Sequence, residues 1–321
     1  MEYRRLGNTG LKVSTICLGT MQFGWTADPT MSESIMDRAV ELGCNFFDTA
    51  DVYSSWYPGN KGGESESIIG DWLAKGQIQR ENLVLASKVR GRMGPGPNDE
   101  GLSRLHVLNA IEDSLRRLKT DYIDLYQVHY PDNETPLEET LAALDRLIRD
   151  GKVRYIGCSN YPAWLLAKSL WISDIQNLAR FDALQPHYNY IHRAEFEREL
   201  QPLCLDQGVG VIPYSPLGGG FLTGKYRQNE QMPDSARASG VQKRYVNEQG
   251  YAAVGKLEEV GRNHGATIAQ TAIAWVLKNP TVSSAIIGAN SIKQLEDTIK
   301  GAELHLSKDE KSTLDEVTAW T

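Results

Sequence analysis

Residues 122–158 read YIDLYQVHYPDNETPLEETLAALDRLIRDGKVRYIGC and contain a complete strand–helix–strand unit. Apolar runs rich in aromatic and β-branched residues at 122–129 and 153–158 predict two strands. Between them, residues 136–149 carry leucines at helical spacing, and Gly151 suits the end of that helix. A strand followed by a helix and a second strand is the repeating unit of α/β folds with a parallel sheet.

The same alternation recurs along the chain. Short apolar runs predict eight strands, at 13–19, 44–48, 83–88, 122–129, 153–158, 182–187, 209–214 and 283–287. Helical periodicity lies at 31–42, 64–74, 103–118, 136–149, 161–172, 194–206, 248–263, 267–278 and 291–300. Eight such units predict an α/β fold of the (β/α)8 TIM-barrel type, with residues 1–321 as one domain and the barrel at about 13–305.

Two segments outside this pattern have their own interpretation. Residues 1–12 predict a short N-terminal β-hairpin that turns at Asn8-Thr9-Gly10 and lies at the mouth opposite the active site. The glycine-rich and then polar stretch 216–246 predicts a long loop, which is either a functional lid or disordered. An open doubly wound sheet is the rival fold, but LGTMQFG after the first strand does not match its GxGxxG signature.

Composition excludes several classes of function. The net charge of −7 argues against a nucleic-acid partner, which requires a basic surface. No apolar run reaches the ~20 residues of a membrane-spanning helix, so no membrane partner is expected. The four cysteines lack CxxC spacing and read as reduced core thiols, which predicts a cytoplasmic protein. Whether the chain is a monomer or a homo-oligomer stays open.

Polar or small residues close the predicted strands. They are Asp48, Lys88, His129, Ser159, Asn160, Gln185, Tyr214, Ser215, Pro216, Gly288 and Ala289. Taken singly, each has an ordinary reading as a helix cap, a solvated charge or a core residue. In a (β/α)8 barrel these positions meet at one mouth, where the chemistry of the fold is located, so as a ring they favour an active site.

Three of these side chains, together with Tyr53, suggest acid–base chemistry. Asp48 ends an apolar strand and needs a cation, which Lys88 on the next strand can supply. Tyr53 follows Asp48 closely, and an adjacent ammonium is expected to lower the pKa of its phenol. With His129 as a hydrogen-bond donor, the group predicts a site that protonates a substrate oxygen.

Several motifs resemble those of the aldo-keto reductases along most of the chain, from about Tyr3 to Leu306. In order they are FFDTADVY, LASKV, YQVHYPD, GCSNY, QPHYN, IPYSPLGGGFLTGKY and IIGANSIKQLEDT. GLSRLHV and TPLEET are similar to the bacterial reductases related to the β subunits of voltage-gated potassium channels. The resemblance implies reduction of aldehydes or ketones, with sugar-type carbonyls included. It also implies Tyr53 as general acid/base, Asp48 and Lys88 as residues that tune it, and His129 as the residue that orients the carbonyl.

The same resemblance implies NADP(H), with NADH as an alternative. The implied cofactor-binding positions are Gly19, Thr20, Asp48, Ser159, Asn160, Gln185, Tyr214, Ser215, Pro216, Leu217, Gly219, Lys225, Arg237, Gly288, Asn290, Gln294, Asp297 and Thr298. Two of them depart from the family pattern, because Thr298 replaces an asparagine and Asn290 replaces a basic or hydroxyl residue. Lys225 and Arg237 can still neutralise a 2′-phosphate, so NADPH is the expected cofactor.

The resemblance implies a small-molecule carbonyl substrate, and its pocket is expected to be aromatic. Residues just past the strand ends supply the candidates, which are Met21, Phe23, Trp25, Trp56, Tyr57, Tyr130 and Tyr161. Two rival functions stay open. A regulatory module that binds NADP(H), as in the channel subunits, would have a broken set of catalytic residues. A metal-dependent barrel hydrolase would have clustered ligands, whereas His106, His187, His192, His264 and His305 are scattered, and no metal is expected.

Overall fold

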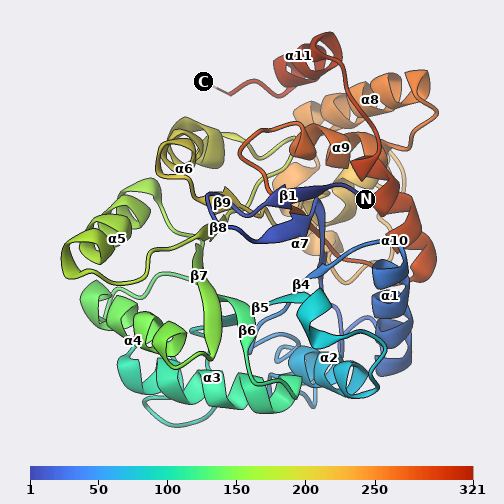
Figure 1. Ribbon diagram of the computed structural model, residues 1–321. Coiled ribbons are helices and arrows are strands. Elements are labelled where there is room, and N and C mark those ends of the chain that lie inside the picture. Colours follow the sequence, from blue (N-terminus) through green and yellow to red (C-terminus); the bar gives the residue numbers. More distant parts are fainter. Residues whose placement is uncertain (321) are drawn as a thin grey trace.

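The computed structural model describes residues 1–320 and is built around an eight-stranded parallel sheet (Figure 1). In chain order its strands are β3 (Ile16–Gly19), β4 (Phe46–Asp48), β5 (Val84–Val89), β6 (Ile123–Val128), β7 (Val153–Ser159), β8 (Ala183–Gln185), β9 (Gly210–Val211) and β10 (Ala285–Ile287). Each strand pairs with its neighbour in the chain, and β10 returns to β3. A parallel bridge between Val211 and Val282 joins the two ends of the sheet. The predicted (β/α)8 barrel is therefore confirmed.

Helices surround the sheet and connect its strands (Figure 1). They are α1 (Pro29–Glu41), α2 (Glu64–Ala74), α3 (Arg104–Leu118), α4 (Leu137–Arg149), α5 (Ala163–Gln176), α6 (Gln201–Gln207), α7 (Ala238–Tyr245), α8 (Glu248–Asn263), α9 (Ile268–Leu277), α10 (Ile292–Ile299) and α11 (Lys308–Val317). Local capping explains several starts. The Ser103 side chain accepts a hydrogen bond from the backbone amide of His106 and caps the start of α3.

Three segments differ from the sequence prediction by more than a shift of a few residues at one end. The run 13–19 is not one strand, because β2 (Lys12–Ser14) pairs antiparallel with β1 (Tyr3–Arg5) and the barrel strand begins at Ile16. The Ser14 hydroxyl donates to the carbonyl of Ile16 at 2.6 Å, which supports a bend inside an apolar run that shows no break in sequence. The hairpin thus extends to Ser14, two residues beyond the predicted 1–12.

The other two segments that differ contain helices. The helix expected at 194–206 begins with a π-helical turn, Phe196–Leu200, before α6. The stretch 216–246 is not a plain loop, because it contains a 3-10 segment at Gly218–Thr223 and α7. The apolar pattern of α7 is weak and lies among polar residues, so the sequence does not predict a helix there. The terminal helix α11 has no counterpart in the sequence prediction.

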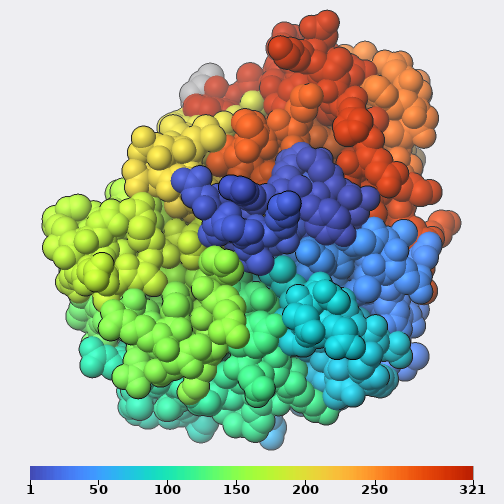
Figure 2. Space-filling model, viewed as in Figure 1, coloured from blue at the N-terminus to red at the C-terminus, as the bar shows by residue number. Residues whose placement is uncertain are grey.

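The hairpin covers the mouth at which the barrel strands begin. Figure 2 shows its surface, in dark blue, over the middle of that face. Leu6 and Val13 are fully buried and join a cluster of barrel-interior residues that includes Phe46. Gly7 adopts a positive φ of +56°, and a side chain there would come within 2.4 Å of the carbonyl oxygen of Gly208. The hairpin therefore closes this end and leaves the other mouth for a site.

Two further findings bear on the sequence analysis. Within residues 1–320, no helix is long and apolar enough to cross a membrane. The four cysteines are buried and form no disulfide, as their spacing predicts. They are Cys17, Cys44, Cys158 and Cys204.

Candidate active site

Three side chains from two neighbouring strands and one loop meet at the carboxyl end of the barrel. The Lys88 ammonium donates to Asp48 Oδ1 at 2.5 Å and to the phenolic oxygen of Tyr53 at 2.9 Å. It donates a third hydrogen bond to the carbonyl of Thr49 at 2.9 Å. All three protons of the ammonium are thus satisfied although Lys88 is fully buried. The cation expected for Asp48 is Lys88.

Two glutamines donate hydrogen bonds to the second carboxylate oxygen of Asp48. Gln127 on β6 and Gln185 on β8 donate to Asp48 Oδ2 at 3.0 and 2.9 Å. Gln185 also donates to Gln127 Oε1 at 3.2 Å, so the three side chains form one buried network. Sequence reasoning missed Gln127. The available signal was a polar side chain inside an apolar strand, two residues before His129 and hence on the same face.

The pKa of Tyr53 differs from the sequence expectation. Burial, the largest influence, raises the pKa of the Tyr53 phenol to about 12, against the opposing effect of Lys88, while Asp48 adds to the increase. The effect of Lys88 has the predicted sign, but the net shift is upward. Although burial disfavours its charged form, Asp48 and Tyr53 raise the pKa of Lys88 above its ordinary value. At neutral pH the arrangement is a protonated phenol beside an ammonium.

His129 faces the Tyr53 ring across the mouth, with ring centroids 5.8 Å apart. Burial first, and then the charges of Lys88 and Arg90, lower the pKa of His129 to about 3. The imidazole is therefore neutral at physiological pH and offers one N–H donor. It also stacks on Tyr130, 5.1 Å away.

Strained backbone positions fix three of the loops around the mouth. Ser54, Asn160 and Ser215 have positive φ angles of 69°, 60° and 55°, a region that non-glycine residues rarely adopt. Ser54 follows Tyr53, and its hydroxyl donates to the carbonyl of Phe23 at 2.6 Å. Such strain persists where the surrounding structure enforces it, and these three residues lie in the loops that follow β4, β7 and β9.

A cavity of about 750 Å³ opens beside Tyr53 and extends toward α10. All 18 sequence-predicted cofactor positions line it, together with Tyr53 and His129. Lys88 lies beneath the wall and contacts the cavity only through Asp48 and Tyr53. The tertiary structure thus brings together residues that span positions 19–298. The volume and elongated lining suit a ligand of dinucleotide size.

The polar residues nearest Tyr53 are already bonded to one another. Asn160 donates to the carbonyl of His129 and to Ser159 Oγ, both at 3.0 Å. Its Oδ1 accepts from the hydroxyl of Tyr214 at 2.9 Å, and Ser159 donates to the carbonyl of Gln185 at 2.8 Å. No described residue donates to Gln185 Oε1, so this oxygen can accept from a ligand amide. These groups, with the flat ring of Tyr214, fit a nicotinamide carboxamide.

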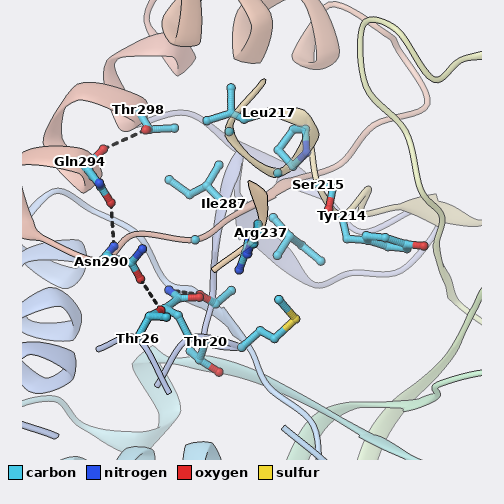
Figure 3. A pocket seen from close by; sticks show the side chains of 18 of the residues that line it. Thr20, Thr26, Tyr214, Ser215, Leu217, Arg237, Ile287, Asn290, Gln294 and Thr298 are labelled. Atoms are coloured by element: carbon cyan, nitrogen blue, oxygen red, sulfur yellow. Dashed lines mark hydrogen bonds between the residues drawn. The ribbon is translucent and has the colours of Figure 1, made fainter. Parts of the chain in front are cut away.

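Two cations line the middle of the cavity without a counterion among residues 1–320. Arg237 is one of the residues that line the pocket (Figure 3). Its guanidinium carbon lies 5.9 Å from the ring centroid of Trp25. Burial lowers its pKa, and burial followed by the charge of Arg237 lowers the pKa of Lys225. Two like charges held close together in a partly buried site favour an anion such as a phosphate.

A polar chain forms the far end of the cavity (Figure 3). Thr26 donates to Asn290 Oδ1 at 2.8 Å, and the backbone N–H of Asn290 donates to Gln294 Oε1 at 2.9 Å. Thr298 on α10 donates to the backbone carbonyl of Gln294 at 2.8 Å. Asp297 also lines this end and is the one acidic side chain among these groups. The polarity suits a nucleoside.

The predicted substrate residues divide into three groups. Met21, Trp25 and Tyr130 line the cavity. Trp56 and Tyr57 do not line it, although Trp56 packs edge-on against Trp25 and Tyr53 at 5.5 and 6.4 Å.

Phe23 and Tyr161 do not belong to the pocket. Phe23 is fully buried in the core, and Tyr161 packs against Phe181 at 5.7 Å. Position after a strand end suggests proximity to the mouth, but the local backbone decides whether a side chain points into the cavity or into the core. These two aromatic residues therefore stabilise the fold and do not line the site.

Several lining residues were not predicted. They are Gln22, Thr26, Gly220, Thr223, Asp234, Ser235, Ala236, Thr267, Ala269, Ile286 and Ile287. Some of them are direct neighbours of predicted positions, as Gly220 is of Gly219, and this adjacency is the sequence signal that could have identified them. Asp234–Ala236 carries no motif of its own and reaches the cavity because the stretch before α7 folds over it. No group of three His, Cys, Asp or Glu side chains in residues 1–320 could hold a metal ion.

Comparison with known proteins gives a consistent result. Residues 15–319 match the model of the aldo/keto reductase family. The chain is 40% identical to an uncharacterized oxidoreductase, YrpG, of Bacillus subtilis, over 96% of this chain and 93% of the relative. It is 36% identical to a probable voltage-gated potassium channel subunit beta of Arabidopsis thaliana, over 95% and 92%. Versiconal hemiacetal acetate reductase of Aspergillus parasiticus is 34% identical, over 98% and 96%.

Proposed function

Because the chain belongs to the aldo/keto reductase family, we propose that it is an NADPH-dependent reductase of aldehydes or ketones, sugar-type carbonyls included. The observation that carries the proposal is the Lys88 ammonium, which bridges Asp48 and the Tyr53 phenol beside a cavity of about 750 Å³. The three groups form a protected proton donor at the place where a carbonyl oxygen can enter.

The reaction needs one proton on the substrate oxygen. Tyr53 donates it, since a phenol with a pKa of about 12 is fully protonated at neutral pH. Negative charge that then develops on the phenol oxygen lies 2.9 Å from the Lys88 ammonium, which stabilises it. Asp48 keeps that ammonium in place, and neutral His129 donates a hydrogen bond that orients the carbonyl.

A reduced nicotinamide, when bound, supplies the hydride that reduces the carbonyl carbon. The contribution of the chain is a shaped and polar pocket. Tyr214 offers a ring face, Gln185 offers a free amide oxygen, and Asn160 holds Tyr214 by its hydroxyl. The backbone of the Ser215–Gly219 segment and the Arg237 and Lys225 cations suit the phosphates.

The preference for NADPH is tested at Arg237. We expect Arg237→Ala to weaken NADPH binding by about 1–3 kcal/mol, or about 5- to 160-fold, as for the loss of a charge-assisted contact, and to leave NADH binding almost unchanged. Fluorescence titration with both nucleotides measures it. Arg227→Ala is the matched control, because Arg227 lies in the same stretch and pairs with Glu258 at 3.8 Å instead. Equal weakening for both cofactors would mean that Arg237 organises the loop and does not bind the 2′-phosphate.

A second candidate function is a regulatory module that binds NADP(H) with little turnover, as the likeness to a channel beta subunit suggests. The complete set of Asp48, Tyr53, Lys88 and His129 favours the enzyme. Mixing the protein with NADPH and 4-nitrobenzaldehyde distinguishes the two. Loss of the reduced-nicotinamide absorbance supports the reductase, whereas a flat trace with tight NADPH binding supports the module.

We further propose that the whole chain acts as one domain in the cytoplasm. Four buried thiols without a disulfide suit a reducing compartment. Limited proteolysis tests the domain proposal, since a stable fragment much shorter than the chain would contradict it.

A further inference from the structure

The outer face of helix α5 carries an apolar stripe that no part of the described chain covers. Trp164 and Ile175 are each 64% exposed, and Trp171 is 61% exposed. The opposite face of the helix packs on the barrel through Leu166, Leu170 and other buried residues. An outer barrel helix normally presents a polar face to water. By contrast, α5 is apolar on the outer face as well as on the face that packs on the barrel. Other exposed apolar side chains of residues 1–320 either adjoin the active-site mouth or stand apart on different elements.

The stripe has the spacing of a coiled-coil seam. Trp164, Lys168, Trp171 and Ile175 follow one another at intervals of four, three and four residues. At 100° per residue these four positions fall within about 60° of one another on the helix surface. A 4-3-4 interval corresponds to the a and d positions of a heptad, which pair with the same positions of a second helix.

The intervals of four, three and four residues read the same in both directions. The stripe can therefore pair with the same stripe of a second copy in antiparallel orientation. In an antiparallel pair of α5 helices with a two-fold axis between residues 169 and 170, Trp164 faces Ile175 of the second helix. Lys168 then faces Trp171, where an ammonium on an indole face makes a cation–π contact. Each contact occurs twice, as an isologous interface requires. The charged residue of the seam is thus matched by a second copy of the same face.

The area involved fits this assignment. Two tryptophans and one isoleucine exposed to this extent present roughly 400 Å², which is as large as the largest apolar patches of ordinary monomers. A stable dimer buries about 800 Å² on each partner. The flanking helices α4 and α6 lie on either side of α5 and supply the remaining rim (Figure 1).

We propose that α5 is a self-association surface through which two copies of this chain form an antiparallel, two-fold dimer. The proposal does not depend on the proposed enzymatic activity. A membrane surface is the less suitable occupant, because the stripe has one lysine and the chain carries a net charge of −7, while interfacial helices carry several cations.

Sedimentation equilibrium of the full chain tests the proposal. We expect a species of twice the 35.7 kDa chain mass, and we expect Trp171→Glu to weaken its association at least 10-fold. Leu105→Glu is the matched control, because Leu105 is 53% exposed on α3 and belongs to no stripe. Circular dichroism verifies that each variant is folded. If Trp171→Glu is not folded, the milder Trp171→Gln replaces it. A monomer at tens of micromolar, or an oligomer that Trp171→Glu or Trp171→Gln leaves intact, overturns the proposal.

Cross-linking tests the orientation. Trp164→Cys and Ile175→Cys proteins, mixed and mildly oxidised, should form a disulfide-linked heterodimer, while neither protein alone should cross-link efficiently. The native cysteines are buried and do not interfere. Cross-linking of Trp164→Cys alone would mean a parallel pair and overturn the antiparallel arrangement. Flotation of the wild-type protein with anionic vesicles, lost in Trp171→Glu, would assign the stripe to a membrane instead.

Discussion

At the scale of single residues, the opposing influences on Tyr53 determine its chemistry. The phenol is 9% exposed, and burial raises its pKa more strongly than the Lys88 ammonium lowers it. In the reaction we propose, Lys88 therefore acts less by making Tyr53 a stronger acid at rest than by stabilising the charge that develops during proton transfer. The Asp48 carboxylate and its two glutamine donors keep the ammonium fixed for that purpose.

Removal of the Tyr53 hydroxyl isolates this role. We expect Tyr53→Phe to slow aldehyde reduction by about 10²–10⁴-fold, because general acid catalysis contributes that much, and to preserve NADPH binding. Single-turnover stopped-flow kinetics with saturating cofactor measures the chemical step. Tyr155→Phe on β7 is the matched control and should be silent. Near wild-type rates for Tyr53→Phe would end this mechanism and make His129 the first alternative donor.

The pH dependence of reduction follows from the two pKa shifts. Tyr53 must be protonated to donate, and a pKa of about 12 keeps it so in weakly alkaline solution. His129 must be neutral, and a pKa of about 3 keeps it so in weakly acidic solution. We therefore expect kcat/KM for reduction to be level between about pH 5 and pH 9. A change in kcat/KM near pH 6.5 that is absent from His129→Gln would show that the histidine titrates normally.

At the scale of elements, α7 and the β8 end are joined behind the cavity. The Tyr245 hydroxyl on α7 lies 3.0 Å from His187 Nε2, and the His187 ring stacks on Tyr214 with centroids 5.1 Å apart and planes 10° apart. Asn189 donates to the carbonyl of Ser215 at 3.1 Å and completes the connection. The segment that covers the cavity is thus anchored to the ring that lines it.

Breaking this anchor should affect cofactor exchange more than chemistry. We expect Tyr245→Phe to accelerate NADPH dissociation about 5-fold, which corresponds to one hydrogen bond of about 1 kcal/mol, and to leave the single-turnover rate nearly constant. Stopped-flow NADPH fluorescence measures the dissociation. Tyr251→Phe on α8 is the control, because that ring packs near the same segment while its hydroxyl bonds to no described residue. Equal effects of both variants would exclude a specific role for the anchor.

At the scale of the whole molecule, stability and activity occupy opposite ends of the barrel. The hairpin residues Leu6 and Val13 fill the mouth at which the strands begin, and the polar ring occupies the other. This division is usual for (β/α)8 barrels. A change at the hairpin end should therefore alter the free energy of unfolding without altering the chemistry.

Leu6→Ala tests that division. Leu6 is fully buried, so we expect its truncation to lower the free energy of unfolding by about 2–5 kcal/mol. Activity at 25 °C should stay close to wild type. Urea denaturation measures the stability, and Leu105→Ala at an exposed site should change it by less than about 0.5 kcal/mol. A large loss of kcat at full folding would mean that the two ends are coupled.

The sequence by itself determined the barrel and most of the site. Strand and helix periodicities are local, and a parallel barrel places every strand end at one mouth, so Asp48, Lys88 and His129 could be grouped before their contacts were known. The cofactor positions came from motif resemblance. All of them line the cavity, and their roles in binding remain proposals.

Only the tertiary structure decided the direction in which individual side chains point and the burial that each one experiences. Phe23 and Tyr161 follow strand ends and yet enter the core, while Gln127 lies inside a strand and yet reaches Asp48. The upward pKa shift of Tyr53 has the same origin. Burial sums the contacts of residues that are far apart in the chain, so no local pattern encodes it.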